Sequence, residues 1–214
     1  MDRSRVAIVI PALNESLTIA SVVEAVSQYG TAIVVDDGST DGTALLALRA
    51  GALVVSHKKN RGYDAALNTG FEKAATSGMG IIITMDADGQ HDPSLIQRFI
   101  DAIDSGADVV AGIRNRRQRM AEHIFAWYTR LRFDLRDPLC GMKAYRIDVY
   151  TKLGYFDSYG SVGTQLIIFA AMRNFRVEQI QLNIRKRQGS SRFGQVISGN
   201  LKILRAMLLS VKLK

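Results

Sequence analysis

Apolar runs and amphipathic segments alternate along the first half of the chain. Apolar, β-prone runs at 5–11, 32–36, 52–56, 81–85 and 107–112 predict strands, and the segments 16–29, 43–50, 64–77 and 93–104 have helical spacing. We expect Pro11 to end the first strand and Ser16 to cap the first helix. Because strand and helix alternate, this half predicts a doubly wound α/β sheet with right-handed crossovers.

The hydrophobic pattern of the second half is less regular. A turn at 136–146 enters a short strand, residues 163–174 have helical spacing, and residues 176–184 alternate like an edge strand. A basic loop rich in glycine and serine, 185–194, leads to an apolar and cationic helix at 195–214. We therefore expect one domain over residues 1–194, with the helix at 195–214 either part of it or a contact with a membrane surface.

A further helix is expected at 120–133, where Trp127 and other aromatic residues lie among basic ones. This composition suits a membrane interface, and it equally suits a helix packed on the sheet. The helix at 195–214 has three interpretations: it lies on a bilayer, covers the sheet or packs on a partner chain. The pattern of residues does not choose among them.

Composition restricts the class of protein. With 214 residues, 47% hydrophobic and 22% charged, the chain is long enough for one domain with a full core and is not of a disordered type. The single cysteine, Cys140, excludes an internal disulfide and a cysteine-based zinc site, and it fits a reducing compartment. We expect no signal peptide, because the first strand meets Pro11 at once, and no membrane span.

Charge is distributed unevenly along the chain. Residues 1–113 hold 8 Lys and Arg against 14 Asp and Glu, a net −6, whereas residues 114–214 hold 20 against 6, a net +14. An acidic half that suits a metal is followed by a basic half that suits anions. Candidate anions are nucleotide phosphates, a lipid phosphate, an acidic membrane surface and nucleic acid.

Two carboxylates, Asp86 and Asp88, follow the apolar run at 81–85, and Gly89 lets the backbone turn away. In open α/β sheets, ligands bind at the carboxyl ends of strands. Two neighbouring carboxylates repel each other unless a cation lies beside them, and their oxygens suit Mg²⁺ or Mn²⁺ with substrate phosphates completing the shell. The alternative is a surface loop with two solvated acids.

The second strand ends in the same way, at Asp36 and Asp37. Carboxylates in this position bind ribose hydroxyls or a base edge. The alternative is a turn at 39–41 that caps the next helix, which explains Asp41 better than it explains Asp37.

Basic residues follow two other strands. Lys58, Lys59 and Arg61 lie beside Gly62 and either face phosphates or belong to a solvated loop, which is the better interpretation of the two lysines. Arg114 comes just past the strand at 107–112, on the same sheet edge as Asp86, where a guanidinium can clamp a pyrophosphate.

Several of these motifs, in this order, resemble family 2 glycosyltransferases of the GT-A fold, and most closely the polyprenyl-phosphate sugar synthases. The resemblance covers nearly all of the chain. It is carried by Val9–Glu15, Val35–Gly42, Asn60–Gly62, Met85–Gln90, Asp137–Gly141 and Gly189–Arg192. It implies a Rossmann-like nucleotide-diphospho-sugar transferase fold, with a mixed sheet flanked by helices.

The resemblance also implies roles for individual residues. The donor nucleoside would be bound by Pro11, Leu13, Glu15, Val35 and Asp37. A divalent cation, Mg²⁺ or Mn²⁺, would be held on the diphosphate by Asp86, Asp88 and Gln90, with Ala87 between them. Arg114 would bind near the phosphates of donor or acceptor, and Arg136 and the position of Cys140 would meet the acceptor phosphate. Arg187 and Arg192 would close over the diphosphate. The expected catalytic residues are Asp88, Arg114 and Arg136.

Three departures from the family pattern bear on mechanism. The late motif usually ends Ser-Lys and here reads Ser191-Arg192, which keeps the charge but changes its geometry. The position of Cys140 is usually serine, so a hydroxyl contact to the acceptor is weakened. An acid is common where Gln165 stands. Many relatives also carry membrane spans after this domain.

The reaction implied is metal-dependent, inverting transfer of a sugar from a GDP- or UDP-sugar to a polyprenyl phosphate. An alcohol acceptor needs a general base, whereas a phosphate monoester is already mostly anionic near neutral pH. The missing carboxylate at Gln165 therefore favours a phosphate acceptor, although Asp137 and Asp157 stay open as bases. We expect a cytoplasmic enzyme, peripheral on the cytoplasmic face of the membrane, and leave a homo-oligomer or a membrane-protein partner open.

Two other functions compete with this one. A soluble family 2 enzyme would use a saccharide hydroxyl as its acceptor. A nucleic-acid binder is suggested by the net charge of +8, but it leaves the acids at the strand ends unexplained, and we expect no nucleic-acid partner.

Overall fold

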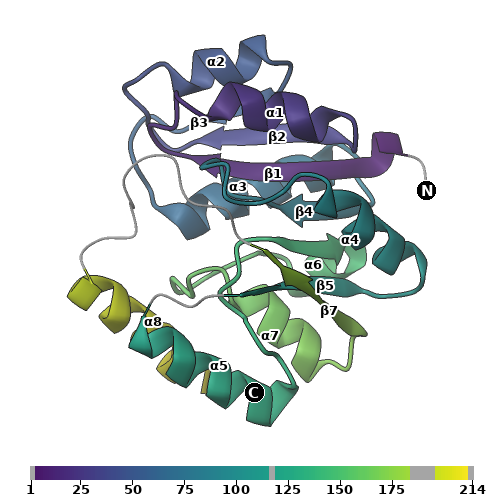
Figure 1. Ribbon diagram of the computed structural model, residues 1–214, viewed down its shortest axis with the longest axis vertical. Helices are drawn as coiled ribbons and strands as arrows, with labels where there is room; N and C mark the ends of the chain where they lie inside the picture. The colour runs from purple at the N-terminus through teal and green to yellow at the C-terminus, as the bar shows by residue number, and fades with distance from the viewer. Residues whose placement is uncertain (1–2, 116–118, 184–195, 212–214) are drawn as a thin grey trace.

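The computed structural model describes residues 3–115, 119–183 and 196–211. Its strands form one mixed sheet in the order β3-β2-β1-β4-β6-β5-β7 (Figure 1). The strands are β1 (Val6–Ala12), β2 (Thr31–Asp36), β3 (Leu53–Ser56), β4 (Ile81–Thr84), β5 (Val109–Arg114), β6 (Lys143–Arg146) and β7 (Val177–Leu182). β6 runs antiparallel to β4 and β5, and the other neighbours are parallel. The predicted mixed α/β sheet is confirmed.

Helices cover both faces of this sheet. They are α1 (Ile19–Ser27), α2 (Thr43–Arg49), α3 (Tyr63–Thr76), α4 (Leu95–Asp104), α5 (Met120–Phe133), α6 (Ile147–Leu153), α7 (Gln165–Met172) and α8 (Val196–Val211), with a short 3-10 helix at Arg3–Arg5. Successive strand residues point to opposite faces. Val6 and Ile8 therefore pack with α1, α2 and α4, whereas Ala7 and Val9 pack with α3 and α5–α8.

The first strand continues through Pro11, contrary to our expectation. Pairing of β1 with β4 stops at Val9 and Thr84, and the Val9 carbonyl accepts the N–H of Met85. Because alternate residues of a strand direct their backbone groups to alternate sides, position 11 faces the β4 side beyond the end of that pairing. A missing N–H costs nothing there.

The start of α1 also differs from the prediction. The helix begins at Ile19 rather than near Ser16, whose N–H instead donates to Asp41 Oδ2 at 3.1 Å. Thr18 precedes the helix, but its hydroxyl donates to the Ala87 carbonyl at 2.7 Å. The hydroxyl and amide groups before α1 thus connect it to neighbouring loops.

Helix α6 was not predicted. It has seven residues, and its sequence includes β-branched Ile147, Val149 and Thr151, which favour strands. Burial of Val149 and Tyr150 against α3 and α7 residues outweighs this local preference.

Helix α5 packs on the molecule with one face and exposes the other. Phe125 and Ala126 are buried, whereas Trp127 and Leu131 are exposed. The helix also lies against α8 (Figure 1). The packing interpretation of this segment is therefore confirmed for its inner face. Of the helices in the described residues, none is both long and apolar enough to cross a bilayer.

Candidate functional site

The carboxyl ends of β1, β2, β4 and β5 lie at one edge of the sheet, together with those of β3 and β7, on the left in Figure 1. β2, β1 and β4 are parallel, and β5 runs in the same direction because β6 is antiparallel to both β4 and β5. Asp37, Asp86 and Arg114 therefore lie at this edge, as predicted. The single antiparallel strand β6 brings the turn at 137–141 to the same edge, since it enters the sheet from there.

Asp86 lies just past β4 with about a third of its side chain exposed, 33%. The Tyr63 hydroxyl donates to its Oδ1 at 3.4 Å. On the other side it abuts Gly141, where an added Cβ would lie 2.3 Å from Oδ2. The carboxylate is thus held between a helix start and the 137–141 turn while one part of it stays open to solvent.

Asp88 is buried and shapes the turn that follows. Its Oδ1 accepts the N–H of Gln90 at 3.1 Å, and Gly89 between them has φ +72°, a conformation that glycine adopts at little cost. The Ala87 carbonyl accepts the hydroxyl of Thr18. The stretch 86–90 is therefore a fixed turn joined to α1.

His91 is a residue that the sequence interpretation missed. Its side chain is buried, its Nδ1 lies 3.8 Å from Asp86 Oδ2, and that nitrogen has no hydrogen-bond partner within the described residues. Its place directly after Gln90 in the acidic stretch was the available signal. A buried imidazole beside a carboxylate gives this site a polar group with unused bonding capacity.

Asp37 uses both carboxylate oxygens to hold a neighbouring loop. Oδ1 lies 2.7 Å from His57 Nδ1 and accepts the N–H of Arg61 at 2.9 Å, and Oδ2 accepts the N–H of Gly62 at 2.7 Å. The loop that carries Arg61 is therefore positioned by the acid at the end of β2. This explains Asp37 better than a capping turn does.

The other predicted nucleoside-binding residues surround the end of β1. Pro11, Leu13 and Glu15 are half-buried, but Val35 is fully buried, with its side chain near Gly70 of α3. The Glu15 N–H donates to Thr43 Oγ1 at 2.8 Å, which joins the loop after β1 to the start of α2. The structure thus brings three of these side chains to the surface and keeps Val35 inside.

Arg114 is bound by two carboxylates of the protein itself. Its Nε and Nη2 donate to the two oxygens of Asp137 at 2.8 and 2.9 Å, and Nη2 lies 3.2 Å from Glu122 Oε2. Both acids are buried. Hydrogen bonds and charges from Asp137, with the charge of Glu122, outweigh burial and raise the pKa of Arg114. This network fastens the end of β5 to α5 and to the 137–141 turn.

The remaining predicted phosphate contacts lie in different surroundings. Arg136 is exposed next to this network, and its N–H donates to Gln179 Oε1 at 2.8 Å. Cys140 is fully buried, and burial raises the pKa of its thiol to about 12, so it is not presented to a ligand at the surface. Arg187 and Arg192 lie outside the described residues.

A tightly bound loop at 157–164 forms a further wall near Asp86. Asp157 accepts the N–H groups of Gly160 and Ser161, and Asp64 accepts those of Val162 and Gly163. Val162 has φ 55°, a costly conformation for a β-branched residue, which these bonds maintain. Burial and the charge of Asp157 raise the pKa of Asp64 to about 6.

Lys143 joins this loop to the 137–141 turn. Its buried ammonium donates to the carbonyls of Cys140 at 2.5 Å and Gly163 at 3.2 Å. Burial lowers its pKa. A Cβ at Gly163 would lie 3.4 Å from the ring of Tyr63, so the loop also supports the tyrosine that contacts Asp86. The Lys143 ammonium therefore holds together the 137–141 turn and the 157–164 loop, the two segments near Asp86.

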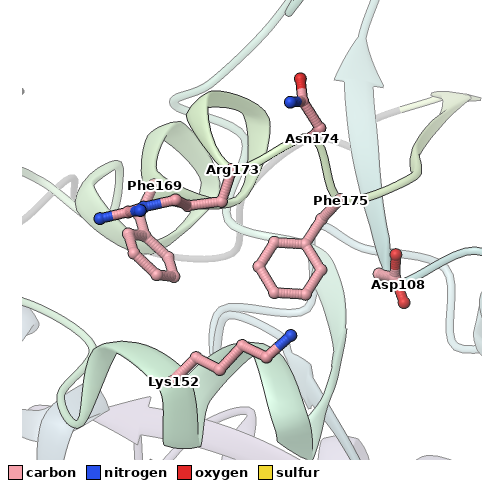
Figure 2. Close-up of a pocket in the computed structure, with 6 residues that line it drawn as sticks. All are labelled: Asp108, Lys152, Phe169, Arg173, Asn174 and Phe175. Atoms are coloured by element: carbon pink, nitrogen blue, oxygen red, sulfur yellow. The ribbon is translucent and has the colours of Figure 1, made fainter.

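A hollow of about 680 Å³ lies away from this edge (Figure 2). It is lined by Asp108, Lys152, Phe169, Arg173, Asn174 and Phe175. Asp108 precedes β5, so the hollow lies at the opposite end of the strands. Its two cations stand near aromatic rings, with Lys152 Nζ 4.7 Å from the centre of Phe175. None of the predicted site residues lines it.

Comparison with known proteins adds independent findings. Residues 7–175 match the model of glycosyl transferase family 2. The chain is 30% identical over 208 residues to the polyprenol monophosphomannose synthase of Mycolicibacterium smegmatis, covering 86% of this chain and 78% of that protein. It is 30% identical over 211 residues to an uncharacterized glycosyltransferase of Mycobacterium tuberculosis, covering 94% of each.

A solved structure shares the fold. Glucosyl-3-phosphoglycerate synthase from Mycobacterium tuberculosis, in complex with Mn²⁺ and uridine-diphosphate-glucose, superimposes with a TM-score of 0.79 at 25% identity. The match covers 99% of this chain and 80% of that one. The GT-A architecture predicted from the motifs is confirmed, and the chain belongs to glycosyl transferase family 2.

Proposed function

We propose that this glycosyltransferase moves a sugar from a GDP- or UDP-sugar to the phosphate of a polyprenyl phosphate. An oxygen of the acceptor phosphate attacks the anomeric carbon, and the bond from that carbon to the nucleoside diphosphate breaks with its electron pair. A single displacement of this kind inverts the anomeric centre. The similarity to a polyprenol monophosphomannose synthase supports the acceptor class.

The observation that carries this proposal is that Gln165 is neutral, buried and hydrogen-bonded within the protein. Its side chain is buried, its Oε1 accepts the N–H of Ser158 at 2.7 Å, and its Nε2 lies within 3.4 Å of the Tyr155 hydroxyl. The family resemblance implies an acid at this position, but in this chain it holds a neutral side chain that is hydrogen-bonded within the protein. A hydroxyl acceptor would lack a base at this place, whereas a phosphate acceptor needs none.

Both of the other candidate bases are engaged in contacts within the protein. Both oxygens of Asp137 are bound by the guanidinium of Arg114. Both oxygens of Asp157 accept backbone N–H groups of the 157–164 loop. This supports an acceptor that arrives already ionised.

A divalent cation fits the donor groups at the end of β4. In the described residues, no three His, Cys, Asp or Glu side chains gather into a closed metal cage. Mg²⁺ and Mn²⁺ commonly use one or two carboxylates and complete their shell with substrate phosphates, so Asp86 and Asp88, with Gln90, are a sufficient set. When bound, the cation stabilises negative charge on the departing diphosphate. The relative that binds Mn²⁺ with uridine-diphosphate-glucose supports this assignment.

Gly141→Ala tests the position of Asp86. A methyl group 2.3 Å from Asp86 Oδ2 would displace the carboxylate, which is on a short side chain. We expect Mn²⁺ affinity and transfer activity to fall roughly 10- to 100-fold, as for other groups that orient a metal ligand. Calorimetry and steady-state kinetics measure this. Gly80→Ala is the control, because its methyl would meet the Arg5 side chain at an ordinary 3.6 Å. Equal behaviour of the two variants would contradict the packing argument.

The remaining groups have proposed roles in binding. Pro11, Leu13 and Glu15 border the nucleoside, and Asp37 positions the loop of Arg61 beside it. Arg136 meets the acceptor phosphate, and Arg187 and Arg192 close on the diphosphate. Arg114 positions the 137–141 turn through its hydrogen bonds to Asp137. We assign Arg114 a contact with a donor phosphate only if that phosphate displaces Asp137 or Glu122 from the guanidinium.

A second candidate acceptor is a small, water-soluble phosphorylated compound or saccharide. It is favoured by the fold shared with glucosyl-3-phosphoglycerate synthase, one structure of which is a complex with phosphoglyceric acid. A cytoplasmic enzyme at a membrane surface fits the lipid acceptor, and a freely diffusing one fits this alternative.

The two acceptors are separated by one assay. The protein is incubated with Mn²⁺, a panel of radiolabelled GDP- and UDP-sugars, and either polyprenyl phosphate in detergent or phosphoglyceric acid with a set of saccharides. We expect label in the organic phase with polyprenyl phosphate and one donor. Label in a water-soluble product alone, or no transfer to the lipid with any donor, would overturn the proposed acceptor.

A further inference from the structure

A stripe of large apolar side chains runs along the exposed face of α5. Met120, Ile124, Trp127 and Leu131 are 73%, 42%, 66% and 69% exposed. Their spacing of four, three and four residues places them on one side of the helix. The opposite side, with Phe125 and Ala126, is buried in the core. Folding of the domain therefore leaves these four side chains exposed, and we call them the α5 stripe.

The neighbouring helix α8 presents the same kind of surface. Leu201 and Leu208 are exposed and lie two turns apart, while Ile203 and Ala206 are buried. The helices pack together, and the Ala121 N–H donates to Asn200 Oδ1 at 3.4 Å (Figure 1). Two adjacent helices thus expose large apolar side chains, and exposed apolar surface of this kind is typical of interaction sites.

The exposed charges around the α5 stripe are mostly positive, although Asp134, the C-cap residue of α5, is an exposed acid. Arg130 and Arg132 are exposed in the last turn of α5, and Lys202 is exposed on α8. The one acid of α5, Glu122, is buried and lies 3.2 Å from the Arg114 guanidinium, and α8 contains none. Apolar and aromatic side chains flanked by cations complement an anionic bilayer surface. A second copy would bring like charges together, which disfavours self-association.

We propose that the α5 stripe docks this enzyme on the surface of an anionic lipid bilayer. The inference rests on the proposed function, for which it names the surface where the lipid acceptor is met. Glu122 connects the docked helix to Arg114 at the end of β5. Docking therefore places the strand edge that carries the site beside the lipid headgroups, where a polyprenyl phosphate presents its phosphate.

Tryptophan fluorescence measures this docking directly, because Trp127 is the single tryptophan of the sequence. The full chain is titrated with vesicles of phosphatidylcholine and phosphatidylglycerol, and with phosphatidylcholine alone. We expect co-sedimentation with the anionic vesicles, a blue shift of the Trp127 emission and quenching by lipids brominated on their acyl chains. Addition of salt should weaken binding, because the basic side chains contribute to it.

Ile124→Gln with Leu131→Gln keeps the fluorescent probe and removes apolar contact. We expect partitioning to fall about tenfold or more, since two aliphatic side chains no longer enter the bilayer. Leu48→Gln on α2 is the control, because Leu48 is 59% exposed on another helix, and it should bind vesicles normally.

The outcomes separate docking from the proposed acceptor. Vesicle binding without a shift in Trp127 emission, or a shift that depends on protein concentration and not on lipid, would overturn the docking surface. If docking holds but no sugar reaches polyprenyl phosphate in detergent, the acceptor is wrong and the surface stands. If transfer in detergent is normal and the double variant still binds vesicles fully, the surface is wrong and the acceptor stands.

Discussion

Asp88→Asn should reduce kcat/KM for sugar transfer by at least about 10³-fold, equivalent to about 4 kcal/mol of transition-state stabilisation. The amide keeps the size of the side chain, and its oxygen can still accept the Gln90 N–H that shapes the turn. In the proposed mechanism, what is lost is the negative charge that would hold a divalent cation against the leaving diphosphate. Steady-state kinetics with a labelled nucleotide sugar, at saturating and at limiting Mn²⁺, measure the loss.

The control for this variant is Asp148→Asn. Asp148 is exposed in the first turn of α6, away from the strand edge, and its neutralisation changes net charge by the same amount. We expect it to keep nearly full activity. Asp88→Asn with activity within a few-fold of the native protein, or with a large loss of folded protein, would contradict the role given to this carboxylate.

Arg114→Met should lower the free energy of unfolding by about 3–5 kcal/mol. The substitution leaves Asp137 and Glu122 buried without the cation that both contact. Removing one member of a buried ionic network costs more than the network contributes, because the remaining charges stay desolvated. Urea unfolding of the native and variant proteins, with the midpoint and slope compared, measures the change.

Two further variants make this prediction specific. Arg176→Met breaks a 2.7 Å ion pair with Glu178, and because this pair is much more exposed than the Arg114 network, the loss should be below about 1 kcal/mol. Adding Asp137→Asn to Arg114→Met removes the buried charge that accepts two hydrogen bonds from the Arg114 guanidinium, and it should recover part of the stability. A loss for Arg114→Met no greater than that for Arg176→Met would show that the network is not held as the structure describes.

The strands of the first half and the acids at their ends follow from local sequence, and for this reason they could be predicted. A continuous apolar run that ends in Asp86 indicates a buried strand, and Asp86 marks the point where the chain leaves the core. The parallel pairing of β1, β2 and β4 then brings their ends together. Each of these inferences needs only a few neighbouring residues.

The partners of the site residues depend on contacts that local sequence does not record. Arg114 and Asp137 are 23 residues apart and meet because β6 enters the sheet antiparallel. Asp64 supports a loop nearly 100 residues later in the chain. The sequence therefore predicted Arg114 as a phosphate clamp, whereas the structure shows its guanidinium bound by buried acids. The roles of Arg187 and Arg192 stay predictions, since both lie outside the described residues.

The most direct test of the account is to locate the cation. Crystals of the protein grown with MnCl₂ and a nucleoside diphosphate are measured at the manganese absorption edge. The account predicts an anomalous peak within about 2.5 Å of carboxylate oxygens of Asp86 and Asp88 and in contact with the diphosphate, and no such peak for Asp88→Asn. A nucleotide bound elsewhere, or bound at this edge with no manganese peak beside those acids, would contradict it.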